Sequence, residues 1–255
     1  MNIAIVTGAS SGMGKEFVLG LDKQQPFDEI WVVARREDRL VALQNETTAK
    51  IVPIALDLSK EESYDVIAKK LEEEKPNVKV LVNASGYGKF KAFCDVPLKE
   101  YLGMIDVNCK AVVAITYLVL PFMKEGAEIY QLGSLSCFQP VPYMNIYGSS
   151  KAFVLSFSRA LNVELRSRKI KVMAVCPGWV LTEFFDRAKD DDTVNYYNVY
   201  RTAEDVIKKA LVDMKKGKDV SILGFQERTQ VRMTKLLPHK MIMNVWLKQQ
   251  KLNKR

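Results

Sequence analysis

The residues with the clearest capacity for chemistry are Tyr147 and Lys151, which stand four positions apart. On an α-helix this spacing places both side chains on one face. A free tyrosine loses its proton near roughly pH 10, and a neighbouring cation favours the phenolate. The pair is therefore suited to giving and taking a proton near neutral pH.

The same spacing separates Tyr87 from Lys91, so spacing alone does not locate a site. Ser134 stands thirteen residues before Tyr147, just after the apolar run Glu128–Leu132, whereas an acid occupies the matching place before Tyr87. Ligands of open α/β sheets bind at the carboxyl ends of strands, where Ser134 would lie. The pair that begins at Tyr147 is therefore the predicted site of proton transfer.

A glycine-rich turn, Thr7–Gly14, follows the first apolar run Asn2–Val6 and precedes a helical pattern. Its spacing is T-G-x-x-x-G-x-G, which is neither a P-loop nor the usual G-x-G-x-x-G. Glycines let the backbone approach a pyrophosphate, and a helix N-terminus supplies amide donors to it. The turn predicts a nucleotide site made by Gly8, Ser10, Ser11, Gly12, Met13 and Gly14.

Two arginines, Arg35 and Arg36, end the second apolar run. An acid at this place would hydrogen-bond the ribose hydroxyls of NAD, whereas an arginine can pair with the 2′-phosphate of NADP. No acid precedes Glu37, so NADP(H) is favoured over NAD(H). The alternative is that both arginines are ordinary solvated residues.

Apolar, β-branched runs alternate with amphipathic stretches along the chain. Strands that are apolar throughout and alternate with helices indicate a parallel sheet covered on both faces. We therefore expect one α/β domain over residues 1–225, a Rossmann-like, doubly wound parallel sheet of about seven strands. The predicted strands are Asn2–Val6, Glu29–Ala34, Ile51–Ala55, Lys79–Val82, Glu128–Leu132, Lys171–Val175 and Asp219–Leu223, and the predicted helices are Lys15–Lys23, Ser63–Glu74, Leu98–Lys124, Asn145–Arg168 and Ala203–Lys215.

With these motifs in order, the chain resembles the short-chain dehydrogenase/reductase family over residues 1 to about 224. Asn83–Gly86 stands where the family has N-N-A-G, although Ala84 and Ser85 depart from that pattern, and Pro177–Thr182 matches its P-G segment. The resemblance implies four catalytic residues: Asn108, Ser134, Tyr147 and Lys151. It also implies cofactor contacts from Asp57, Leu58, Asn83, Ala84, Ser85, Tyr147, Lys151, Pro177, Gly178, Val180 and Thr182.

The roles that the resemblance implies suit the residue types. Tyr147 would act as general acid and base, and Lys151 would favour its phenolate and hold the ribose. Ser134 would hydrogen-bond the substrate oxygen, with Ser136 as the alternative hydroxyl. Asn108 would anchor a water for a proton relay, or would merely cap or kink its helix. Asp57 would contact adenine, or would be only an acid at a helix N-terminus.

These residues predict an NADP(H)-dependent oxidoreductase that interconverts a carbonyl and a secondary alcohol by hydride transfer. The alternative is a non-catalytic nucleotide-sensing protein of the same fold. A segment near residues 183–202 lies where the family has its substrate lid. An apolar substrate, such as a steroid, a fatty-acyl derivative or an aromatic carbonyl, is expected if the aromatic residues line a pocket rather than a core. Those residues are Phe138, Tyr143, Trp179, Phe184 and Phe185, with Tyr196, Tyr197 and Tyr200 in the lid.

Charge is concentrated at one end of the chain. The net charge is +8, but residues 226–255 hold eight bases and one acid, which leaves the remainder at +1. A near-neutral body without a recognition motif argues against nucleic acid as a partner. The single histidine, His239, lies in this tail, which excludes a Ser-His-Asp hydrolase or a histidine-liganded metal in the body, and no metal site is expected.

The tail is expected to be a basic amphipathic helix that begins near Pro238. Its apolar stripe is Met241, Ile242, Val245 and Trp246. It could contact a membrane surface, which would suit a membrane-attached lipid or steroid reductase, or pack on its own domain or a partner subunit. We expect a cytoplasmic protein, with membrane association through the tail as the open alternative, and the family resemblance implies a homodimer or homotetramer. The apolar run Ala111–Met123 is too short to cross a bilayer.

Overall fold

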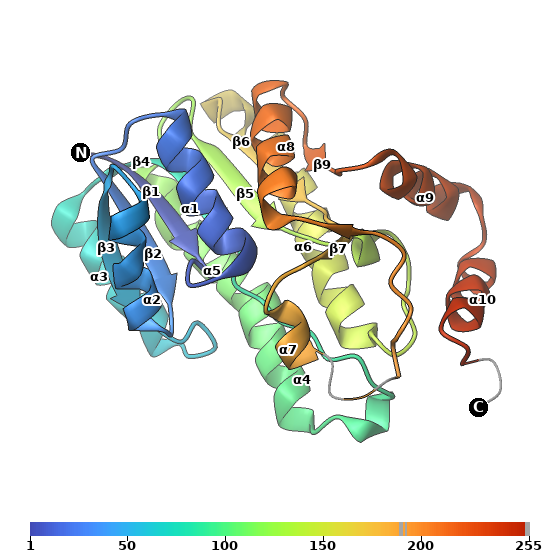
Figure 1. Ribbon diagram of the computed structural model, residues 1–255. Coiled ribbons are helices and arrows are strands. Elements are labelled where there is room, and N and C mark those ends of the chain that lie inside the picture. Colours follow the sequence, from blue (N-terminus) through green and yellow to red (C-terminus); the bar gives the residue numbers. More distant parts are fainter. Residues whose placement is uncertain (189–190, 192, 253–255) are drawn as a thin grey trace.

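The computed structural model describes residues 1–188, 191 and 193–252, so parts of the predicted lid and the last three residues of the tail lie outside the description. A seven-stranded parallel sheet forms its centre, in the order β3-β2-β1-β4-β5-β6-β9, and a small pair, β7-β8, stands apart (Figure 1). The predicted Rossmann-like fold is confirmed. The strands are β1 (Asn2–Thr7), β2 (Glu29–Ala34), β3 (Lys50–Ala55), β4 (Asn77–Asn83), β5 (Glu128–Leu132), β6 (Lys171–Val175), β7 (Trp179–Val180), β8 (Tyr200–Arg201) and β9 (Val220–Ser221).

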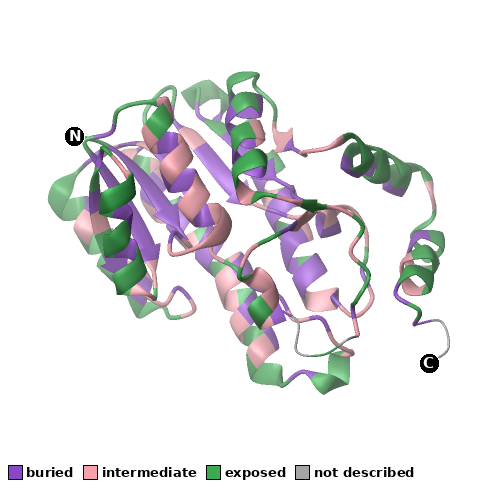
Figure 2. Cartoon of the chain, in the orientation of Figure 1, coloured by how far each residue is buried: buried purple, intermediate pink, exposed green. Residues whose placement is uncertain are grey.

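Helices cover both faces of the sheet, and the strands are buried between them (Figure 2). Side chains of β1 alternate: Ile3 and Ile5 join the core under α3 and α5, whereas Ala4 and Val6 join the core under α1 and α8. The continuous apolar runs are therefore explained by burial on both faces. The helices are α1 (Gly12–Gln24), α2 (Glu37–Ala42), α3 (Glu62–Glu74), α4 (Leu98–Ile105), α5 (Ala111–Val119), α6 (Asn145–Glu164), α7 (Phe184–Ala188), α8 (Ala203–Lys215), α9 (Phe225–Leu236) and α10 (His239–Gln249).

One helical stretch runs without interruption from Leu98 to Phe122 through α4, a π-turn at Asp106–Lys110 and α5. By length and composition alone, its 25 residues are long and apolar enough to cross a membrane. The apolar run Ala111–Met123, judged too short to cross a bilayer, is only part of this longer helix. In this fold the stretch packs beside α3 and α6 and buries one face, which includes Met104 and Ile115, in the core. It therefore serves here as a core helix.

The chain after β9 forms two helices, α9 and α10, that lie along one side of the body beyond β7 and α6 (Figure 1). The expected helix after Pro238 is α10, and α9 precedes it. The predicted apolar stripe is divided in space. Ile242 is buried and Trp246 half-buried against the body, whereas Met241 and Val245 are exposed. Only part of the tail's apolar side therefore packs on the chain's own domain.

Candidate active site

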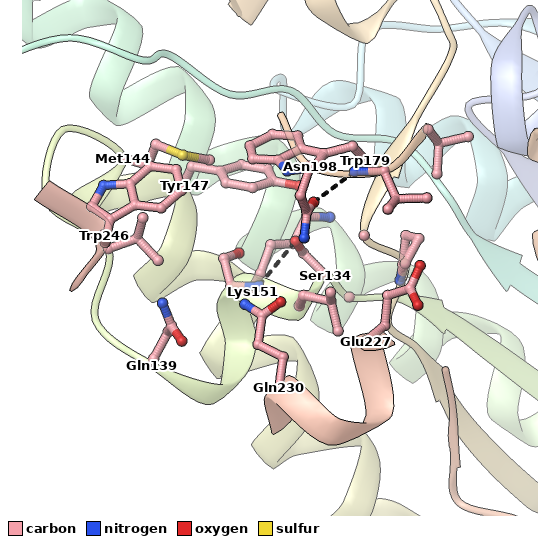
Figure 3. Close-up of a pocket in the computed structure, with 18 of the residues that line it drawn as sticks. Ser134, Gln139, Met144, Tyr147, Lys151, Trp179, Asn198, Glu227, Gln230 and Trp246 are labelled. Carbon is pink, nitrogen blue, oxygen red and sulfur yellow. Dashed lines mark hydrogen bonds between the residues drawn. The ribbon is translucent and has the colours of Figure 1, made fainter. Parts of the chain in front are cut away.

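A cavity of about 340 Å³ lies at the carboxyl ends of the central strands. In the sheet order, β1 neighbours both β2 and β4, and this reversal of strand order opens a crevice in doubly wound folds. The glycine turn, the end of β5, α6, the lid and the tail all contribute to the wall of the cavity. The catalytic residues Ser134, Tyr147 and Lys151 implied by the resemblance all line it (Figure 3).

Tyr147 and Lys151 lie on the buried face of α6, where they are 8% and 4% exposed. The Lys151 Nζ atom is 5.9 Å from the centroid of the Tyr147 ring and donates a hydrogen bond of 2.7 Å to the Leu132 carbonyl. Burial raises the pKa of Tyr147, and a hydrogen bond with the Ser134 hydroxyl partly offsets this rise. Burial also lowers the pKa of Lys151. Desolvation thus favours the neutral form of both groups.

Ser134 directly precedes a short 3-10 turn, Leu135–Phe138, and its hydroxyl accepts a hydrogen bond of 3.2 Å from the Ser136 amide. Its hydroxyl also contacts Tyr147. The alternative hydroxyl, on Ser136, is buried and has no hydrogen-bond partner among the described residues. The geometry therefore favours Ser134 as the hydroxyl that acts with Tyr147. The competing tyrosine, Tyr87, lies outside any helix and donates to the Glu100 carbonyl.

Asn108 is fully buried in the π-turn, a local widening that is frequent at functional sites. Its Oδ1 accepts from the Tyr87 amide at 3.1 Å, and its Nδ2 donates to the Tyr87 carbonyl and to the Ser150 hydroxyl, each at 3.0 Å. A Cβ atom added to Gly86 would lie 2.9 Å from Asn108 Oδ1 and 3.3 Å from Lys151 Nζ. Glycine at position 86 therefore keeps open the space between these two polar atoms.

The glycine turn forms a cradle that fits a pyrophosphate. Gly8 and Gly12 have φ values of +69° and +52°, which favour glycine, and a Cβ on Gly14 would lie 2.1 Å from the Gly8 carbonyl oxygen. No side chain caps the N-terminus of α1, and its first turn holds no acid. Its amide groups and helix dipole can therefore be offered to a phosphate.

The two predicted arginines differ in their surroundings. Arg36 donates to the hydroxyls of Ser10 and Ser11, the latter at 2.8 Å, and forms an ion pair of 2.7 Å with Glu183 of the lid. Arg35 is exposed, and its charge contributes to lowering the pKa of Asp57. Only Arg36 therefore lies over the glycine turn.

Arg39 is a cation at this site that the sequence analysis missed. It forms an ion pair with Glu183. Hydrogen bonds from Arg36 and Arg39 lower the pKa of Glu183 to about 2, although the Glu183 side chain is 43% exposed. Arg39 stands three residues after Arg36, about one helical turn, and this spacing could have indicated that the two cations lie together.

The remaining residues that the resemblance implies as cofactor contacts differ in their positions. The amides of Ala84 and Ser85 donate to the Thr7 hydroxyl, which ties the end of β4 to the glycine turn. The side chains of Asn83 and Leu58 are buried, so only their backbones could reach a cofactor. Asp57 accepts from the amide and hydroxyl of Ser59, as in the alternative interpretation of a helix N-terminal acid. The cavity is lined by Met13, Ala84, Pro177, Gly178, Val180 and Thr182.

The aromatic prediction is correct in part. Trp179, Phe184 and Phe185 line the cavity, whereas Phe138 and Tyr143 are not among its lining residues. Other apolar lining residues were not anticipated, and some of them come from the tail. They include Phe90, Val141, Met144, Met233, Leu237 and Ile242.

Residues 2–193 match the sequence profile of the short chain dehydrogenase family. The chain belongs to the short-chain dehydrogenase family. This dehydrogenase is 34% identical to sulfoacetaldehyde reductase 2 of Chromohalobacter salexigens over 192 residues, which cover 72% of this chain and 74% of that protein. It is 35% identical to the very-long-chain 3-oxoacyl-CoA reductase of Bos taurus over 193 residues, which cover 71% and 60% of the two chains.

The fold of this dehydrogenase also matches a solved family member. A short-chain dehydrogenase from Sphingobium yanoikuyae, in complex with NADPH, is 26% identical and superposes with a TM-score of 0.78 over 96% of each chain. The chain is therefore an NAD(P)-dependent oxidoreductase of the CH–OH and C=O groups. The match to the family profile ends at residue 193, before α8, α9 and α10.

Proposed function

We propose that the enzyme interconverts a bulky, uncharged, apolar carbonyl compound and its secondary alcohol, with NADP(H) as cofactor. The observation that carries this substrate class is the cavity lining. Lys151 is the single cation among the residues known to line the cavity, and its Nζ atom is already bonded to Leu132. The remaining wall is largely aromatic and aliphatic. An anionic substrate would be desolvated there without a free cationic partner among the described lining residues, which is costly.

The relatives point to different substrates, and the lining favours one of them. A sulfonate, as in the name of the Chromohalobacter relative, would need cationic partners that the described lining does not offer. A long acyl chain, as in the name of the bovine relative, would match the apolar wall of Phe90, Met144 and Leu237. We therefore propose a ketone or aldehyde with an apolar body of acyl, steroid or aromatic type.

The chain's own residues supply positioning and the proton. A bound nicotinamide would supply or accept the hydride. In the direction of reduction, the Tyr147 hydroxyl gives its proton to the substrate oxygen, and the raised pKa of Tyr147 keeps that proton in place at neutral pH. The Ser134 hydroxyl donates a hydrogen bond to the same oxygen as charge develops there. Lys151 and Asn108, on either side of Gly86, frame a path by which Tyr147 regains a proton.

The preference for NADP(H) rests on Arg36, with Arg39 beside it. Arg36 lies against the hydroxyls of Ser10 and Ser11 at the glycine turn, where a 2′-phosphate could form charge-assisted hydrogen bonds with it. No carboxylate stands at the end of β2 to accept hydrogen bonds from the ribose of NAD. The NADPH in the Sphingobium structure is consistent with this choice.

A panel of carbonyl compounds tests the proposal directly. Propiophenone, decanal and a steroid ketone are compared with sulfoacetaldehyde and glyoxylate, and the loss of NADPH or NADH absorbance is followed. We expect the uncharged compounds to react at least about tenfold faster per unit concentration than the anionic ones, because an unpaired buried charge is costly. Faster turnover of sulfoacetaldehyde or glyoxylate would exclude the apolar substrate class.

The two directions of the reaction are expected to differ in their dependence on pH. Reduction needs protonated Tyr147, and burial raises its pKa, so the rate of reduction should stay nearly flat between about pH 6 and pH 9. Oxidation needs the phenolate, whose fraction grows about tenfold per pH unit below the pKa. Initial rates in both directions measure this. An oxidation rate that is flat over the same range would contradict Tyr147 as the base.

We also propose that the outer faces of α4, α5 and α6 pair with a second copy of the chain. These faces expose Leu102, Tyr117 and Phe153, and Tyr117 is 78% exposed. Adjoining apolar side chains of this kind mark interaction surfaces. Tyr117→Glu is expected to convert the assembly to a 29.0 kDa monomer in sedimentation velocity. Val212→Glu, on α8 across the sheet, is the control and should leave the assembly intact.

Cytoplasmic localisation and membrane contact by the tail stay predictions. Met241 and Val245 are exposed beside Lys240 and Lys248, which is the composition that an anionic membrane surface would attract. The larger apolar residues of the tail contact the domain instead.

A further inference from the structure

We propose that Gln250 is a positioning residue: through it the C-terminal helices hold residues 193–201 of the lid in place and set the outer wall of the cavity. The inference rests on the proposed function for the class of substrate that the cavity binds. The contacts of Gln250 do not depend on which carbonyl compound reacts. It concerns a part of the chain that follows the match to the family profile, which ends at residue 193.

The first observation is a buried carboxamide that binds lid backbone. Gln250 is 1% exposed. Its Oε1 accepts hydrogen bonds from the amides of Asn195 and Tyr196, both at 2.9 Å, and its Nε2 donates to the Tyr196 carbonyl at 3.1 Å. Residues 193–199 belong to no helix or strand, so these three bonds replace the pairing that regular structure would give.

The second observation is that the bonded segment lines the cavity. Tyr196, Asn198 and Val199 are lining residues, and Gln250 fixes the backbone of the first of them. A shift of Gln250 would therefore move Tyr196 and change the shape of the cavity. The C-terminal helices and the turn between them also contribute to the wall, through Met233, Leu237, Ile242 and Val245.

The third observation is that α10 is anchored next to the catalytic helix. Trp246 stands one turn before Gln250, so both lie on the same face of α10. The Trp246 indole donates a hydrogen bond of 3.0 Å to the Pro142 carbonyl, shortly before α6, and lies 6.5 Å from the Trp179 ring (Figure 3). Gln250 therefore joins the lid to a helix that is seated beside Tyr147.

A second contact holds the far end of the lid. Glu227 of α9 is 5% exposed and accepts two hydrogen bonds from Arg201, at 2.8 and 3.2 Å. The lid is thus fixed to α10 at residues 195–196 and to α9 at residue 201. A lid held at two places orders the cavity wall before substrate arrives, which reduces the entropy lost on binding.

The test uses Gln250→Glu and Gln250→Leu in the full chain. Glutamate keeps the shape of the side chain but lacks the Nε2 donor, so a carboxylate oxygen would face the Tyr196 carbonyl and repel it. Leucine removes all three hydrogen bonds. We expect Gln250→Glu to raise KM for propiophenone about tenfold. The kcat for propanal, a much smaller carbonyl compound, and the Kd for NADPH should stay unchanged. Asn244→Asp and Asn244→Leu alter an exposed carboxamide on α10; they are the matched controls and should change none of these three quantities.

Amide hydrogen exchange supplies a measurement that needs no turnover. In Gln250→Leu, exchange in a peptide spanning residues 193–201 should be about tenfold faster than in the parent chain, with the β1 and β4 amides unaffected. Unchanged exchange together with unchanged KM would overturn the proposal. So would an equal loss of NADPH binding and melting temperature, because that result means general destabilisation. If the parent chain reduces no carbonyl in the panel, exchange alone still decides whether Gln250 holds the lid.

Discussion

Tyr147→Phe is expected to lower kcat for carbonyl reduction by about a thousandfold, because general acid catalysis typically contributes a factor of this order. The hydroxyl is the only part removed, and the ring keeps its contacts with Phe90 and Phe184. The variant should therefore fold normally and still bind NADPH, as measured by the change in nicotinamide fluorescence. Single-turnover measurements of NADPH oxidation give the rate.

Tyr143→Phe is the matched control, since Tyr143 packs in the same hydrophobic cluster but does not line the cavity. Its kcat should equal that of the parent enzyme. Turnover by Tyr147→Phe at the parent rate would remove Tyr147 from the mechanism and leave a hydroxyl such as that of Ser134 as the proton source. Loss of NADPH binding in the same variant would assign Tyr147 to the cofactor site.

Arg36→Ala is expected to raise KM for NADPH at least about tenfold and to leave KM for NADH unchanged, because charge-assisted hydrogen bonds to a phosphate are lost. Only NADPH carries the 2′-phosphate, so the ratio of the two KM values isolates this contact. Arg35→Ala is the neighbouring control, because Arg35 is exposed and the hydroxyls of Ser10 and Ser11 accept hydrogen bonds from Arg36 instead. An equal rise in both KM values would show that Arg36 supports the glycine turn and does not select the phosphate.

Glu183→Gln should act in the opposite direction. Glu183 is ionised near neutral pH, since Arg36 and Arg39 lower its pKa to about 2, and its carboxylate occupies the guanidinium groups that a 2′-phosphate would use. Removing its charge should lower KM for NADPH by about twofold to threefold, a modest change because the pair is partly exposed. The same titrations with NADH provide the internal reference.

The sheet was predictable because each of its main strands can be recognised from its own short run of residues. β1, β2 and β4 are runs of branched apolar residues, and a run that is buried on both faces looks the same in sequence wherever it pairs. The juxtaposition of Ser134 with Tyr147 was also predictable. Both residues lie near the carboxyl edge of the sheet, and the fold brings those ends together.

Features that depend on which other part of the chain a segment packs against were not predictable. An amphipathic pattern gives the apolar side of α10 but not the surface that covers it, so the division between Ile242 and Val245 appears only in three dimensions. The ion pair of Arg36 with Glu183 joins residues 147 positions apart. The burial of Tyr147, which raises the pKa of its hydroxyl, was not predictable either, because spacing in a helix does not report burial.

The position of the outer cavity wall affects how new specificities can arise. The proton-transfer groups lie within residues 1–193, whereas α9 and α10 add residues to the cavity wall after residue 224. Part of the wall can therefore vary without a change in the residues proposed to transfer the proton. A single recombination event near residue 202 could join this catalytic body to another C-terminal segment and yield an enzyme with the same reaction and a different substrate. Library design could exploit this division by varying α9 and α10 while keeping Gln250 and Glu227 in place.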